Sequence, residues 1–237
     1  MTSFQDLLIL SLGRGLQVLA GLVTIKTATT LLSPSDVGSM NQLMSLAVLG
    51  ASAILTPVAA YIGRGCLDWM EGGTLSRRLG SYLLVVLAVA PILGFVAWAI
   101  QSQLMVVAAV GAAWVGGLVA LYTLGFSLHS LGTSGLNLMG HRFLYILFGN
   151  VAAWGGLAFA VGYSKGEASP ETWLLGIFCG FLLSSLSFAL LDRYARASVP
   201  AHSSDGPGVL PFDGWTVFMF VWPQAMVFIL WWIQSQS

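Results

Sequence analysis

Charge is the first thing that this chain lacks. Asp, Glu, Lys and Arg make up 8% of its 237 residues, whereas hydrophobic residues make up 57%. A soluble globular domain carries about 25% charged residues, so the composition excludes that class and favours a membrane protein. The 9 basic and 9 acidic residues balance each other, which leaves no basic surface for nucleic acid to bind.

Cysteine and catalytic motifs are also scarce. The only cysteines are Cys66, expected in a loop, and Cys179, expected in a helix, and they form neither a disulfide framework nor a metal-binding spacing. The sequence contains no nucleotide-binding loop and no His/Glu metal spacing. It therefore predicts neither an enzyme nor an ATP-driven pump, and it implies no cofactor or metal.

Seven long apolar stretches follow one another along the chain. A helix needs about 20 apolar residues to cross the hydrocarbon core of a bilayer, and these stretches are apolar on all sides, which favours helices over strands. The predicted spans are Leu7–Leu32, Met40–Ile62, Gly80–Ile100, Leu104–Phe126, Phe143–Tyr163, Trp173–Leu191 and Trp215–Ile233. The expected fold class is all-α integral membrane, a polytopic bundle of about seven transmembrane helices.

A segment rich in Pro, Gly and Ser divides the chain. Asp192–Gly214 contains Pro200, Pro207 and Pro211, a composition typical of a linker. The sequence thus predicts a six-helix bundle at 1–191, a cytoplasmic linker at 192–214 and a seventh helix at 215–237. We expect this helix to begin a second bundle that the chain lacks; the alternative is a genuine seven-helix protein.

Basic residues fall mainly on one side of the predicted membrane. Six arginines follow the second, fourth and sixth spans: Arg64, Arg77, Arg78, Arg142, Arg193 and Arg196. Lys165 alone lies in a loop on the other side, near Glu167 and Glu171. Cytoplasmic loops carry the excess of Lys and Arg, so we expect a cytoplasmic N-terminus.

The first apolar stretch is the only one that contains charged residues, Arg14 and Lys26. A cation inside a span with no embedded acid to pair with is a functional hypothesis by default, and here it predicts a cavity that receives an anion. Helical residues step by about 100°, which places Gln17, Gly21 and Thr24 on the same side as Arg14.

Lys26 is less well placed, about 120° from Arg14 and about 18 Å further along the axis. A cavity would have to be wide or tapering to contact both cations. The predicted substrate-binding residues are Arg14, Gln17, Thr24 and Lys26. The alternative is that both cations snorkel to the membrane interface, because each lies only a turn or so inside the core boundary.

Polar residues elsewhere are weaker signals. His129 is expected just past the fourth helix, Asn137 and His141 in the loop that follows, and Asn150 inside the fifth helix. Each is more typical of a contact between helices or an interfacial group than of a ligand contact. The GxxxG sequence Gly176–Gly180 is typical of close helix packing.

Four short stretches resemble a known family. Thr30–Gly38 (TLLSPSDVG), followed by Asn41–Leu46 (NQLMSL), resembles the first outer loop and second helix of bacterial lipid-linked oligosaccharide flippases. These are the O-antigen or polysaccharide exporters of the multidrug/oligosaccharidyl-lipid/polysaccharide superfamily. Tyr61–Gly65 (YIGRG) resembles the end of that helix, and Asn137–Arg142 (NLMGHR) resembles the loop before the fifth helix. In spacing, the resemblance covers the whole chain, as the N-terminal half of such a protein.

The resemblance implies two six-helix bundles around a cationic cavity and a long cytoplasmic loop, which Asp192–Gly214 matches. The implied substrate is an undecaprenyl-diphosphate-linked oligosaccharide that crosses the bacterial inner membrane for O-antigen or polysaccharide biosynthesis. The resemblance also implies that such a protein works with glycan polymerase and assembly proteins. Arg14 and Lys26 lie on the helix where family members place cavity-lining cations. Family members have more helices than this chain, which weakens the expectation that it transports alone.

The sequence also leaves other functions open. A cation-coupled multidrug exporter of the same superfamily would need an embedded acid, and the spans contain none. A membrane enzyme of glycan assembly, such as a polymerase or acyltransferase, would need acids, His or Arg in its outer loops. Those loops carry only Asp36, Lys165, Glu167 and Glu171. An inert fragment of a disrupted gene is a further alternative.

Overall fold

The computed structural model describes residues 4–104, 111–166 and 168–197, together with isolated positions between 219 and 227. Across these residues the chain is helical, with six helices long and apolar enough to cross a membrane, so the predicted all-α polytopic bundle is confirmed. The first four are α1 (Phe4–Leu31), α2 (Pro34–Glu71), α3 (Leu75–Leu104) and α4 (Ala112–Leu138). The fifth combines α5 (Arg142–Asn150), a π-helical turn η1 (Val151–Gly155) and α6 (Gly156–Tyr163), and the sixth combines α7 (Pro170–Ser184) and α8 (Leu186–Ala197). Most of the predicted linker lies outside the described residues, and of the predicted seventh helix, Trp215–Ile233, only those isolated positions are described, all of them helical.

Several helices extend beyond the predicted spans. α2 has 38 residues, which at about 1.5 Å per residue is longer than the roughly 30 Å hydrocarbon core. Cys66 therefore lies inside α2, where it is buried, and the prediction of a loop at this position was wrong. Asp192–Ala197 belongs to α8, so the described part of the predicted linker is helical. Hydropathy marks the apolar part of a helix, and a helix continues past it wherever backbone hydrogen bonding continues.

The α3–α4 connection also differs from the prediction. The predicted spans leave only Gln101–Gln103 between the third and fourth helices, but these residues lie inside α3, and α4 begins at Ala112 rather than Leu104. Because α4 ends at Leu138, both His129 and Asn137 lie within it. The end of α4 lies 12 residues, about three turns, beyond the predicted end at Phe126, which moves His129 from the expected interface into the span.

Local signals explain where two helices begin. The Ser33 hydroxyl accepts from the Asp36 backbone N–H while the Asp36 carboxylate accepts from the Ser33 backbone, and Pro34 follows directly. Ser169 and Thr172 form the same reciprocal arrangement at the start of α7, again with a proline next. These capping boxes satisfy backbone donors that a helix start leaves free.

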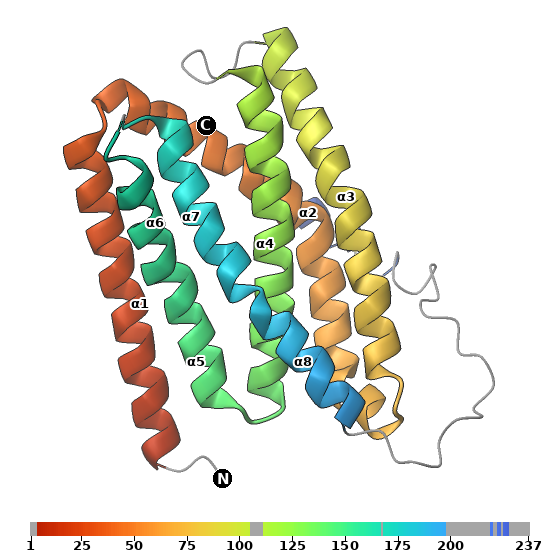
Figure 1. Ribbon diagram of the computed structural model, residues 1–237. Helices are drawn as coiled ribbons and strands as arrows, with labels where there is room; N and C mark the ends of the chain where they lie inside the picture. The colour runs from red at the N-terminus through yellow and green to blue at the C-terminus, as the bar shows by residue number, and fades with distance from the viewer. Residues whose placement is uncertain are drawn as a thin grey trace.

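α4 is the central helix of the described bundle and packs against α2, α3, α7 and α8 (Figure 1). Its glycines permit the closest approaches. A Cβ at Gly116 would lie 2.9 Å from the Gly94 carbonyl oxygen of α3, and one at Gly132 would collide with the Phe188 backbone nitrogen of α8. α1 is peripheral by contrast, contacting mainly α5 and η1, and its outward leucines are available to lipid.

The described arginines of the predicted cytoplasmic loops share one end of the bundle. Figure 1 places the start of α1, the α2–α3 turn, the α4–α5 turn and the end of α8 at this end. Arg142 begins α5, and Arg196 lies in the last turn of α8. Ser76 of α3 donates a hydrogen bond of 2.7 Å to the Asp192 carboxylate of α8, and Arg196 pairs with the same carboxylate. The helices therefore bring together the charges that the positive-inside rule assigns to one side.

Candidate functional site

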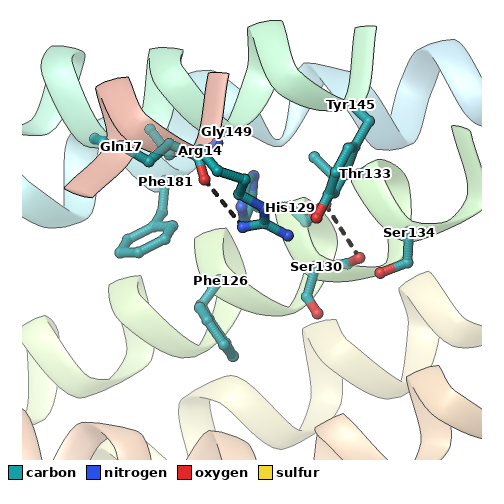
Figure 2. Close-up of a pocket in the computed structure, with 12 residues that line it drawn as sticks. Arg14, Gln17, Phe126, His129, Ser130, Thr133, Ser134, Tyr145, Gly149 and Phe181 are labelled. Carbon is teal, nitrogen blue, oxygen red and sulfur yellow. Dashed lines mark hydrogen bonds between the residues drawn. The ribbon is translucent and has the colours of Figure 1, made fainter. Parts of the chain in front are cut away.

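A polar cavity of about 300 Å³ lies between α1, α4, α5, η1 and α7 (Figure 2). Its position between membrane-spanning helices is typical of binding sites in helical bundles. The lining residues are Arg14, Gln17, Phe126, His129, Ser130, Thr133, Ser134, Tyr145, Gly149, Ala152, Ala153 and Phe181. No carboxylate is among these described lining residues, so Arg14 supplies an uncompensated positive charge.

Arg14 is held by two neighbours. Its Nη1 donates a hydrogen bond of 3.0 Å to Gln17 Oε1, drawn as a dashed line in Figure 2. Its Cζ lies 5.0 Å from the centroid of the Tyr145 ring, within the range of a cation–π interaction. A guanidinium has five N–H donors, and these two contacts leave most of them available for a ligand.

The wall between α1 and α5 is built on small residues. A Cβ at Gly13 would collide with Ile146, and a Cβ at Gly149 would collide with the Gln17 amide. Asn150 Nδ2 donates to the Gly13 carbonyl at 3.3 Å and to the Ile146 carbonyl at 3.0 Å. These two hydrogen bonds fix the position of α1 along α5 and hence the position of Arg14. Asn150 therefore connects helices, the role that the sequence favours for it.

The opposite wall carries a hydrogen-bonded chain from α4 to α5. His129 Nδ1 lies 2.6 Å from Ser184 Oγ of α7, and Ser184 Oγ donates to the Phe148 carbonyl, also at 2.6 Å. Thr133 Oγ1 donates to the His129 carbonyl at 2.8 Å. The imidazole of His129 is thereby held by Ser184 of α7, which is itself hydrogen-bonded to α5.

The structure places only part of the predicted binding face at this site. Arg14 and Gln17 line the cavity together, but Thr24 and Lys26 do not. Thr24 donates to the Ala20 carbonyl of its own helix at 2.7 Å, and Lys26 is exposed on another side of α1. The large separation in angle and height between Arg14 and Lys26 explains this division.

Five polar lining residues were not predicted as binding residues, and only His129 among them was noted from the sequence, as a weak signal. They are His129, Ser130, Thr133, Ser134 and Tyr145. A signal for four of them was present, because residues 129, 130, 133 and 134 recur at the spacing of one helical face. It was overlooked because the fourth helix was expected to end at Phe126.

The fold and the cavity together define a class: a polytopic helical membrane protein with a cationic, acid-free cavity between its described spans. Among the residues that the structure describes, no group of three His, Cys, Asp or Glu is placed to hold a metal ion. Comparisons with protein-family models, with curated proteins and with solved structures find no match to this chain.

Proposed function

We propose that this protein takes part in moving a polyprenyl-diphosphate-linked oligosaccharide across a bacterial inner membrane, and that the Arg14 cavity holds the diphosphate. The observation that carries the proposal is an arginine in a cavity within the membrane, with no carboxylate among the described lining residues. Arginine recognises phosphate through paired N–H groups. The resemblance of Thr30–Gly38 and Asn137–Arg142 to oligosaccharide flippases supplies the substrate class.

The surroundings of the cavity suit such a substrate. The hydroxyls of Ser130, Thr133 and Ser134 add polar groups for phosphate or sugar oxygens. Outside the cavity, Leu12 and Leu16 of α1 are 62% and 50% exposed. They form an apolar surface along which a polyprenyl tail can stay in lipid. The resemblance implies that this bundle rocks against a second one, so that the cavity opens to each side in turn.

The direct test is translocation in sealed proteoliposomes. A polyprenyl-diphosphate oligosaccharide is placed in both leaflets, and an impermeant glycosidase outside measures how much sugar is reached. With the protein present, we expect cleavage to pass beyond the outer-leaflet half; protein-free liposomes provide the control. Cleavage that stops at the outer-leaflet fraction, while the protein still binds diphosphate, would overturn transport by this chain and leave a binding role.

We also propose that the N-terminus is cytoplasmic, which places the α6–α7 turn outside. In a chain with Cys66→Ala and Cys179→Ala, a cysteine in place of exposed Lys165 should react with an impermeant maleimide added to spheroplasts. A cysteine in place of exposed Arg77 should react only after the membrane is permeabilised. The reverse pattern would show the opposite orientation, and the positive-inside argument would then be wrong for this chain.

A further inference from the structure

The hydrogen-bond chain through Ser184 fixes which nitrogen of His129 carries a proton. The Ser184 hydroxyl has one hydrogen and donates it to the Phe148 carbonyl. The contact between Ser184 Oγ and His129 Nδ1 therefore requires Nδ1 to be the donor. A neutral imidazole has one N–H, so its Nε2 is left with a free lone pair.

That Nε2 atom faces accessible space. His129 lines the cavity with Arg14, and Nδ1 accounts for its only side-chain hydrogen bond among the described residues. Nε2 is not fully enclosed by protein atoms. Because His129 is a lining residue, this atom is accessible from the cavity. Figure 2 shows His129 and Arg14 among the residues that line this cavity.

We propose that His129 is a second anion contact in this cavity and that it acts only when protonated. The inference rests on the proposed diphosphate site and adds its regulation by pH. Neutral His129 presents a lone pair that repels phosphate oxygen. Protonated His129 presents an N–H donor and a second positive charge, while Nδ1 keeps its bond to Ser184. Histidine is the side chain whose charge ordinarily changes between about pH 5 and about pH 8.

The groups around His129 set the direction of the linkage. Arg14 from α1 and Tyr145 from α5 are the other ionisable lining residues; α7 contributes Phe181 and Ser184, and α4 itself contributes hydroxyls. A bound diphosphate favours the protonated form of His129, because a nearby anion stabilises the positively charged imidazolium. Anion binding and proton uptake therefore reinforce each other, and by reciprocity release of one promotes release of the other.

Calorimetric titration with inorganic diphosphate tests this in the full chain, held in phosphatidylcholine nanodiscs. Between about pH 8 and about pH 5, the diphosphate affinity of the wild type should increase by a factor about ten times larger than that of His129→Gln. Such a ratio lies within the usual range for coupled sites. Comparing the two proteins at each pH cancels the probe's own titration. His141→Gln is the matched control, because His141 stacks on Tyr194 and is not among the lining residues.

Titrations in two buffers of different ionisation enthalpy give a second readout, the protons taken up per diphosphate bound. We expect greater uptake by the wild type than by His129→Gln, and no change in His141→Gln. Equal uptake and equal pH dependence in wild type and His129→Gln would overturn the role of His129 while leaving the Arg14 site intact. Absence of diphosphate binding at every pH would remove both proposals. Adding phosphatidylglycerol to the nanodiscs shows whether a lipid headgroup competes for the same site.

The wild-type protein alone provides a measurement that does not depend on a variant folding. The chain has three histidines, so ¹⁵N-histidine labelling produces three imidazole spectra, which His141→Gln and a His202→Gln variant assign. At about pH 8 we expect His129 to carry its proton on Nδ1, and added diphosphate at about pH 6 to increase its doubly protonated fraction. A neutral His129 protonated on Nε2, or no response to diphosphate, would contradict the proposal.

Discussion

Replacing Arg14 with Gln is expected to remove most diphosphate binding and most translocation. Hydrogen bonds to charged groups contribute about 1.5–3 kcal/mol, which corresponds to a loss of affinity of roughly 10- to 150-fold. The fold should survive, because Arg14 is exposed and its described contacts are only Gln17 and Tyr145. Diphosphate titration and the proteoliposome assay measure the two losses, and the elution volume and helicity of the variant report on its fold.

The chain contains its own control for this experiment. Lys26 lies on the same helix and has a positive charge, but it does not line the cavity, so Lys26→Gln should keep wild-type affinity. Arg14→Lys should recover part of the binding, because it restores the charge without the planar set of donors. Equal losses in Arg14→Gln and Lys26→Gln would indicate a general effect of charge on the membrane. Unchanged binding in Arg14→Gln would remove the cavity from the proposed function.

The sequence was sufficient for the fold class because each span is long and apolar, a property that depends on the bilayer and not on neighbouring residues. Helix ends were less predictable. The last turn of α3 contains Gln101–Gln103, and the last turns of α4 contain Ser130 and Ser134. These polar residues are more typical of a loop than of a membrane span. At the end of α4, Gly132 and Gly135 pack closely against Phe188 and Leu191 of α8, and a hydropathy profile contains no information about such packing.

The site was predictable only where one helix determines it. Helical spacing places Gln17 beside Arg14, and the structure joins them by a hydrogen bond. Tyr145 approaches Arg14 from a helix more than a hundred residues later in the chain, and no local pattern connects the two. Lys26 shows the converse, because charge type alone grouped it with Arg14 although the two face different surroundings.

A second large effect is expected at Gly180, where α7 crosses the fifth span. A Cβ there would collide with the Gly156 backbone nitrogen and lie 2.5 Å from the Ala152 carbonyl oxygen. These are backbone atoms of η1 and α6 and cannot rotate away, so Gly180→Ala should force the helices apart. Overpacking of this kind costs about 1–3 kcal/mol. Thermal unfolding of the purified protein in detergent should show a midpoint lower by several degrees.

Gly162→Ala provides the matched control for that substitution. Gly162 lies in α6, where a Cβ would meet nothing within 4 Å, so alanine should leave stability unchanged or raise it through its better helix propensity. The comparison also bears on the site, because η1 contributes Ala152 and α7 contributes Phe181 to the cavity wall. If close packing at Gly180 sets the distance between those walls, Gly180→Ala should weaken diphosphate binding as well as stability. A variant as stable as Gly162→Ala would show that the two helices adjust freely, and the cavity could then not owe its shape to this contact.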